Sequence, residues 1–166
     1  MRTKNIVLIG MPGAGKSTIG VVLAKNMGMA FVDSDLVIQE QEGKKLHDLI
    51  QEYGLDGFLA IEGRVNASLH PKTAVIATGG SAVYHEQAMD HLRSIATICY
   101  LKLSYEGIRE RLGDLAERGV VLREGETLRE LYDERVPLYE KYANLTIECE
   151  NKNIREIVME LAKRLK

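Results

Sequence analysis

Short apolar runs alternate with helical patterns along this chain. The first run, residues 6–9, is rich in β-branched side chains and stops at Gly10. After a glycine-rich turn, apolar residues recur at helical spacing up to Gly28, and glycine suits the position just past a helix end. Four more apolar runs, each of which predicts a strand, lie at 30–32, 73–77, 95–101 and 145–149.

Apolar residues at intervals of three and four predict amphipathic helices between these runs. The longest such pattern is Phe58, Ile61, Val65 and Leu69, which ends before Pro71. Other helices are predicted at 36–43, at 46–50, after Ser104 to 112, from Leu128 onward with a restart or kink at Pro137, and at 154–165.

Strands that alternate with helices form right-handed βαβ units, so an α/β fold around a parallel sheet is expected. A length of 166 residues suits one domain, and neither repeats nor a low-complexity linker divide the chain. The helical segment at about 34–70 and the charged, glycine-spaced segment at about 113–125 are therefore interpreted as regions within a single domain, 1–166.

Composition narrows the range of partners. With 22 basic and 24 acidic residues, the net charge of −2 gives no general attraction to nucleic acid or to an anionic membrane. No run reaches the roughly 18 apolar residues of a membrane span, and the apolar start is too short for a signal peptide. Two cysteines, Cys99 and Cys149, without a C-x-x-C pattern indicate a reduced, cytoplasmic protein. Without a heptad or long apolar face, a monomer is expected.

The strongest chemical signal is the segment 10–17, Gly-Met-Pro-Gly-Ala-Gly-Lys-Ser, which fits the pattern G-x-x-x-x-G-K-[ST] between a predicted strand and a predicted helix. Glycines let backbone N–H groups surround phosphate oxygens, and the helix start adds its positive end. Lys16 brings a charge to the β- and γ-phosphates, Ser17 offers a hydroxyl to Mg²⁺, and Thr18 contacts the α-phosphate. The residues expected to bind the triphosphate are Pro12, Gly13, Ala14, Gly15, Lys16, Ser17 and Thr18. This loop alone does not distinguish transfer from hydrolysis or switching.

Two carboxylates follow the second predicted strand, in the triplet Asp33-Ser34-Asp35. The carboxyl ends of parallel strands share one edge of a sheet, so this triplet should lie beside the phosphate loop. One carboxylate could hold Mg²⁺, and the other could accept the proton of an acceptor hydroxyl. Capping of the next helix by Asp33 and Ser34 is the simpler alternative, and the two roles can coexist.

Four further residues have a functional and a structural interpretation. Gly79 and Gly80 end the strand at 73–77 and could bring backbone N–H groups to a ligand, or form an ordinary turn. Arg118 could close over the γ-phosphate as an arginine finger, or be a solvated loop charge. Arg135 precedes a proline and could grip a carboxylate through its planar fork, or pair with an acidic neighbour.

Together these residues resemble the shikimate kinase family, small P-loop kinases of the nucleoside monophosphate kinase type. The matching features run in one register along essentially the whole chain and are 10–17, Asp33-Ser34-Asp35, Phe58 with Glu62, Ala77-Thr78-Gly79-Gly80, Tyr100-Leu101, Arg111, Arg118 and Arg135-x-Pro137-Leu138-Tyr139. The resemblance implies three α/β/α layers around a five-stranded parallel sheet, with a substrate-binding helical region at 34–70 and a lid at 113–125. It also implies transfer of the γ-phosphate of ATP to the 3-hydroxyl of shikimate, in aromatic amino-acid biosynthesis.

The resemblance also implies a role for each matching position. Lys16, Asp35 and Arg118 would be catalytic, with Asp35 at the acceptor hydroxyl as the base or near it. Ser17 and Asp33 would serve Mg²⁺. ATP would be bound by the phosphate loop with Arg118 and with Arg111, which would pack on adenine. The substrate-binding positions would be Asp35, Leu59, Glu62, Gly79, Gly80 and Arg135, the last holding the substrate carboxylate.

Three positions depart from the family pattern. Leu59 stands where the pattern has an arginine that should join Arg135, Ser81 replaces the third glycine of G-G-G, and Gly119 replaces the lid proline. Arg64 does not substitute for the missing arginine, because five residues along a helix turn the side chain by about 140°. Because Leu59 replaces this arginine, a kinase that acts on another small hydroxylated metabolite is an alternative function. A nucleotide-binding homologue without catalysis is a further alternative, which the retained Lys16, Asp35 and Arg118 oppose.

Overall fold

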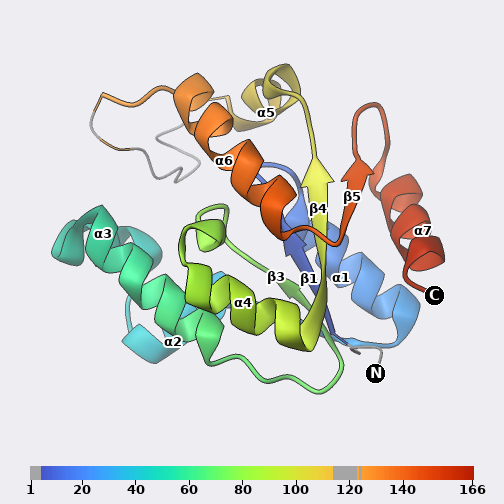
Figure 1. The fold of residues 1–166 in the computed structure, drawn as a ribbon, viewed down its shortest axis with the longest axis horizontal. Coiled ribbons are helices and arrows are strands. Elements are labelled where there is room, and N and C mark those ends of the chain that lie inside the picture. Colours follow the sequence, from blue (N-terminus) through green and yellow to red (C-terminus); the bar gives the residue numbers. More distant parts are fainter. Residues whose placement is uncertain (1–4, 114–122, 124) are drawn as a thin grey trace.

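A computed structural model describes residues 5–113, 123 and 125–166 (Figure 1). In these residues, five strands form one parallel sheet in the order β2-β3-β1-β4-β5. The strands are β1 (Asn5–Ile9), β2 (Ala30–Asp33), β3 (Ala74–Ala77), β4 (Ala96–Lys102) and β5 (Leu145–Glu148).

Helices cover both faces of the sheet, so the α/β fold and its three layers are confirmed. α1 packs on α7 on one side, and α3, α4 and α6 lie on the other (Figure 1). The helices are α1 (Lys16–Met27), α2 (Ser34–Glu42), α3 (Leu46–Ala67), the short 3₁₀ helix η1 (Ala82–Tyr84), α4 (Glu86–Ile95), α5 (Tyr105–Leu112), α6 (Leu128–Tyr142) and α7 (Ile154–Arg164).

The central strand β1 is buried along its whole length. It pairs with β3 on one edge and β4 on the other, so that Val7 faces Ile76 and Ile98 in neighbouring strands. Helices on both faces explain why this strand reads as a continuous apolar run instead of an alternating one. The glycine-rich turn at Gly10 therefore leaves from the best-supported strand of the sheet.

A second, smaller core holds α2 against α3. It consists of Ile38, Leu49, Phe58 and Val65, which are all buried. α3 is not one regular helix, since Gly54 adopts φ 73° and ψ 176° and separates its two parts. This pair of helices forms the segment that the sequence assigned to substrate binding.

The structure differs from the sequence-based elements in several places. The patterns predicted separately at 46–50 and 58–69 fall in the single element α3, which ends at Ala67, and η1 was not predicted. α4 was not predicted, and the strand expected from residue 95 begins at Ala96, directly after that helix. α6 neither ends nor restarts at Pro137. Pro137 is exposed, so the carbonyl of Asp133 that loses its intrahelical partner can bond to water.

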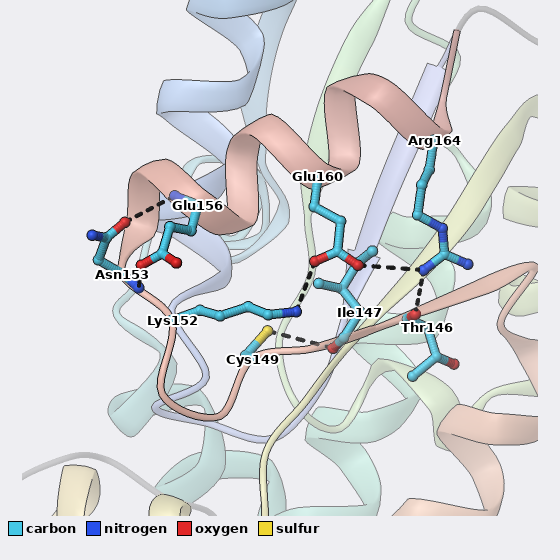
Figure 2. A network of polar contacts seen from close by, with 8 residues as sticks. All are labelled: Thr146, Ile147, Cys149, Lys152, Asn153, Glu156, Glu160 and Arg164. Carbon is cyan, nitrogen blue, oxygen red and sulfur yellow. Dashed lines mark hydrogen bonds and ion pairs between the residues drawn. The ribbon is translucent and has the colours of Figure 1, made fainter.

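Polar contacts fix the turn between β5 and α7 (Figure 2). Asn153 and Glu156 form a reciprocal capping box at the start of α7. Lys152 Nζ lies 2.8 Å from Glu160, and Arg164 Nη1 donates to the carbonyl of Thr146 at 2.8 Å. The first two contacts fix the loop after β5, and the third ties the end of α7 to β5 itself. Among the described helices, none is long and apolar enough to cross a membrane.

Candidate active site

Glycines shape the phosphate loop that leaves β1. Gly10 has φ 151°, and a Cβ there would lie 2.9 Å from the carbonyl oxygen of Leu101. Gly15 has φ 93° and precedes the first residue of α1, whose N-terminus has no side-chain cap. The loop therefore keeps close to the sheet and presents backbone N–H groups at a helix start, which is the geometry of a phosphate cradle.

Lys16 is buried at the centre of this loop. Its Nζ donates to the carbonyls of Gly10 at 2.6 Å and Met11 at 2.8 Å. Burial lowers its pKa to about 8, against the opposing attraction of Asp35. The two carbonyl groups satisfy the hydrogen bonds of the Lys16 ammonium only in part and carry no net charge. A phosphate in the cradle would supply a negatively charged partner.

Asp33 links the phosphate loop to α2. Its Oδ1 accepts from the backbone N–H groups of Asp35 at 3.0 Å and Leu36 at 3.4 Å, so it caps the helix. Its Oδ2 accepts from the hydroxyl of Ser17 at 3.2 Å. Capping and contact with the loop thus coexist. The pair offers only oxygen atoms beside the phosphate cradle, which fits the ligand preference of Mg²⁺.

Two carboxylates converge on Gly79. A Cβ on this glycine would lie 2.9 Å from Oδ1 of Asp35 and 2.9 Å from Oε2 of Glu62. The pKa of Asp35 is raised by burial and by the charge of Asp33, while Lys16 opposes the shift. Only glycine leaves room for both acids, so the turn after β3 forms the floor of a small acidic site.

Glu62 is almost completely buried, with 2% of its surface exposed. Its Oε1 accepts from the hydroxyl of Ser81 at 2.7 Å, and its Oε2 has no hydrogen-bond partner in the described part of the chain. Burial raises its pKa to about 7, although the Ser81 hydrogen bond lowers it. Near neutral pH this carboxyl is therefore shared between its neutral and charged forms.

Close packing of α3 brings Glu62 to this place. A Cβ on Gly63 would overlap the ring of His85, with its nearest atom at 2.0 Å, so the absence of a side chain lets α3 approach the segment after η1. The Nδ1 of His85 accepts from the backbone of Ala88 and caps α4. The two helices thus meet beside the turn that carries Ser81.

Arg135 enters the site from α6 and is 3% exposed. Its Nε donates to the hydroxyl of Tyr84 at 3.2 Å, and its guanidinium lies 5.3 Å from the centre of that ring. Tyr139, one turn further along the same helix face, donates to the carbonyl of Gly80 at 2.7 Å. The arginine and tyrosine of the Arg-x-Pro-Leu-Tyr motif therefore both contact the turn that follows β3, either directly or through η1.

Gly80 lies between the phosphate loop and α6. A Cβ there would lie 2.7 Å from Cδ of Pro12 and 3.0 Å from Nη1 of Arg135. The glycine therefore lets the phosphate loop and the guanidinium approach each other across the backbone. The structure brings together Lys16 and five residues predicted to bind the acceptor, namely Asp35, Glu62, Gly79, Gly80 and Arg135.

Arg111 lies on the other side of the phosphate loop. Its Nη1 donates to the carbonyls of Gly13 and Ala14, each at 3.4 Å. α5 thus places a guanidinium next to the cradle. Arg118 falls outside the described residues, as does the predicted lid at 113–125 apart from Gly113, Arg123 and Gly125.

Leu59 is the position that supplies no charge. It is half-buried and packs against the small core between α2 and α3. Arg64 is bound to Glu42 of α2 at the surface, which confirms that it does not replace the missing arginine. Within the described residues, α3 therefore contributes Glu62 but no cation to the site.

Sequence reasoning missed Tyr84 as a part of this site. Its ring contacts Arg135 from η1, a short element with no periodic pattern of its own. Tyr84 lies only five residues after Gly79. A residue that follows a strand-end turn so closely stays near the same sheet edge, and this proximity could have indicated that Tyr84 belongs to the site. The serine at 81 was noticed as a departure, but its hydrogen bond to Glu62 was not foreseen.

A phosphate cradle after the central strand, facing buried acids and a buried guanidinium, defines a P-loop phosphotransferase that acts on a hydroxyl group. The family model described as shikimate kinase matches residues 12–166. The chain belongs to the shikimate kinase family.

Individual relatives agree with this assignment over nearly the whole chain. A shikimate kinase from Thermodesulfovibrio yellowstonii is 36% identical over 163 residues, covering 96% of this chain and 94% of that protein. One from Persephonella marina is 33% identical, with 98% and 99% covered. The solved structure of shikimate kinase from Acinetobacter baumannii in complex with shikimate superposes with a TM-score of 0.88 at 30% identity, covering 98% and 93%.

Proposed function

We propose that this protein transfers the γ-phosphate of ATP to the 3-hydroxyl of shikimate. Family membership supports the reaction, and one observation in the site carries it: Lys16, Asp35 and Arg135, from three different helices, lie around the turn at Gly79–Gly80. This arrangement offers a cation to a phosphate, a carboxylate to a hydroxyl and a guanidinium to an acid group. The γ-phosphate of ATP matches the first, and an acceptor that is both an alcohol and a carboxylic acid matches the other two.

On the nucleotide side, the backbone N–H groups of 13–15 and the start of α1 would hold the β-phosphate. Lys16 would exchange its two carbonyl partners for oxygens of the β- and γ-phosphates. Thr18 would contact the α-phosphate, Arg111 would pack on adenine, and Arg118 would approach the γ-phosphate. These roles rest on position and residue type.

Ser17 and Asp33 would hold Mg²⁺, Asp33 directly or through water. When bound, the ion supplies positive charge to the β- and γ-phosphate oxygens as the negative charge shifts in the transition state. Asp33 also caps α2, so the same side chain couples this site to the helix that carries Asp35.

In the chemical step, the acceptor oxygen forms a bond to the γ-phosphorus while the bond from that phosphorus to the β,γ-bridging oxygen breaks. The hydroxyl proton passes to a carboxylate oxygen of Asp35, and ADP leaves with the bond's electrons. The raised pKa of Asp35 makes this carboxylate a stronger base than an ordinary surface aspartate. Lys16 and Arg118 would stabilise the charge on the transferred group.

On the acceptor side, Arg135 would bind the carboxylate of shikimate, and the backbone at Gly79 and Gly80 would lie close to the shikimate ring. Glu62 would accept or donate a hydrogen bond to a hydroxyl, according to its protonation. The segment at 34–70 would act as the substrate-binding region and 113–125 as the lid within one domain. We expect a cytoplasmic monomer.

A specific observation favours a second candidate, a kinase of another small hydroxylated metabolite. Leu59 leaves Arg135 without the arginine that the family pattern places opposite it. ADP release should therefore be measured with shikimate, gluconate, other hydroxylated acids and neutral polyols. Turnover with shikimate at the highest kcat/KM supports the first function. Turnover with another alcohol alone supports the second, and tight ATP binding without ADP release from any acceptor would indicate a non-catalytic homologue.

A further inference from the structure

We propose that Arg123 supplies the second guanidinium for the acceptor carboxylate, in place of the arginine that Leu59 replaces. This inference rests on the proposed function, since it assumes an acceptor with a carboxylate. Arg123 stands near the end of the segment 113–125, and the sequence analysis assigned no role to it. It is singled out by its contacts with Tyr84 and Glu134.

The first observation concerns Arg135. Its guanidinium is buried, yet in the described part of the chain no carboxylate lies within 4 Å of it. Its one protein hydrogen bond there goes to the hydroxyl of Tyr84. A buried charge without an ionic partner is unfavourable, so this group is suited to receive an anion.

The second observation is that Tyr84 brings two guanidinium groups together. Its ring centre lies 5.3 Å from Cζ of Arg135 and 5.8 Å from Cζ of Arg123. The two arginines come from different segments, one from α6 and one from the chain before it, and they meet at a single aromatic side chain. Both guanidinium groups border Tyr84, and the inference places the acceptor carboxylate at this ring, where the flexible side chain of Arg123 can turn from Glu134 toward it.

The backbone of Arg123 is anchored. Its N–H donates to Oε1 of Glu126 at 3.2 Å, and its carbonyl accepts from the N–H of Glu126 at 2.9 Å. These reciprocal bonds tie the residue to the turn just before α6, the helix that carries Arg135. The positions of the two guanidinium groups are thus set by neighbouring parts of the same structure.

The side chain of Arg123 already holds a carboxylate. Its Nη1 lies 3.3 Å and 3.5 Å from the two oxygens of Glu134. Both side chains are close to half exposed, and exposed ion pairs contribute little to stability. A carboxylate of the acceptor can therefore take the place of Glu134 without a large loss elsewhere.

The test compares Arg123→Gln with a matched surface variant. Arg129→Gln is the control, because Arg129 also pairs with an acid on α6 and packs on a tyrosine, but this tyrosine is Tyr105. We expect Arg123→Gln to raise the KM for shikimate by about 10- to 100-fold, the range typical of one charge-assisted hydrogen bond. The KM for ATP should change less than twofold, and Arg129→Gln should leave both values unchanged.

Three further measurements separate carboxylate binding from a general defect. An analogue in which the carboxylate is reduced to a primary alcohol should bind wild type and Arg123→Gln equally. Leu59→Arg in the Arg123→Gln background should restore a low KM for shikimate. Glu134→Gln, which frees Arg123, should lower the KM severalfold.

The outcomes distinguish this inference from the proposed function. If wild type does not phosphorylate shikimate, the proposed function fails and the inference fails with it. If wild type is active but Arg123→Gln keeps its KM within twofold, only the inference is overturned. An equal loss with the neutral analogue overturns it as well.

Discussion

Ser81 donates its hydroxyl hydrogen bond to Oε1 of Glu62 at 2.7 Å, inside the turn that follows β3. The family pattern has a glycine at this position, which has no hydroxyl to offer. The bond favours the charged form of a carboxyl that burial pushes toward the neutral form, and the pKa settles at about 7. Glu62 therefore changes its charge within the physiological range, beside the proposed acceptor site.

Ser81→Gly should move this titration to higher pH. Removal of the hydrogen bond takes away the largest interaction that lowers the pKa of Glu62, so the carboxyl should stay neutral beyond pH 7. The pH dependence of the KM for shikimate would reveal the shift. A profile identical to wild type would show that Ser81 does not control Glu62.

Glu62→Gln should flatten the dependence of stability on pH. The pKa of a glutamate in the unfolded chain is 4.5, and in the folded protein the pKa of Glu62 is about 7, so between these values the folded state keeps a proton that the unfolded state has lost. The free energy of unfolding contributed by this group is fully present below pH 4.5 and falls as pH rises through 7. The slope is about 1.4 kcal/mol per pH unit at most.

Urea unfolding of Glu62→Gln from about pH 5 to 8 would measure this change. Glu40→Gln is a suitable control, because Glu40 is exposed on α2. The control should keep the wild-type slope. A Glu62→Gln protein with the same slope as wild type would contradict the assignment.

Lys16→Met should remove turnover while leaving the fold intact. A cation aimed at the transferred phosphate accounts for at least about 100-fold in kcat in comparable sites. Burial lowers the pKa of Lys16 to about 8, so below that pH its charge destabilises the folded state. ADP release should therefore be lost, and the melting temperature at neutral pH should not fall. Retained turnover would exclude the proposed role.

Asp35→Asn should reduce kcat far more than it weakens ATP binding. The amide keeps the shape of the side chain but cannot take the acceptor proton, and general-base catalysis contributes about 10²- to 10⁴-fold. Kinetics and calorimetric titration with ATP would separate the two effects. Equal losses in both would mean that Asp35 acts on the nucleotide.

Leu59→Arg should lower the KM for shikimate by about 10- to 100-fold in the Arg123→Gln background, where the acceptor carboxylate has Arg135 as its guanidinium partner. Leu59 is half-buried at the edge of the small core, so a longer side chain can leave the core and reach the site. Leu59→Met, which keeps an apolar side chain there, is the control. If the KM stays the same or rises, the pocket is built for a different acceptor.

The sequence was most informative where one local rule decides the structure. The phosphate loop, the strand-end acids and the alternation of strands and helices were foreseen, because glycine geometry and periodicity act over a few residues. α4 was missed although Ala88, Met89 and Leu92 lie on one buried face. A histidine cap at His85, instead of serine or aspartate, hid the start of that helix.

Contacts between distant segments were harder to predict. The order of the strands and the meeting of Tyr84 with Arg123 and Arg135 depend on packing between elements, to which no spacing in the chain refers. The same holds for the close approach of Gly63 to His85. In the sequence, Gly63 looks like any other glycine within a helix. The site is built largely from such contacts between distant segments. The sequence therefore indicated which residues belong to the site more readily than which hydrogen bonds those residues form with one another.

The placement of β1 between two partners has a consequence for motion. Each amide hydrogen of this buried strand points to β3 or to β4 between covering helices, so exchange should be slowest at the base of the nucleotide cradle. α2 and α3 are fastened by a core of four fully buried side chains and can open at a lower free energy. Local opening should therefore be concentrated in α2 and α3, the half that would bind the acceptor. The half around β1 that would bind the nucleotide should stay rigid.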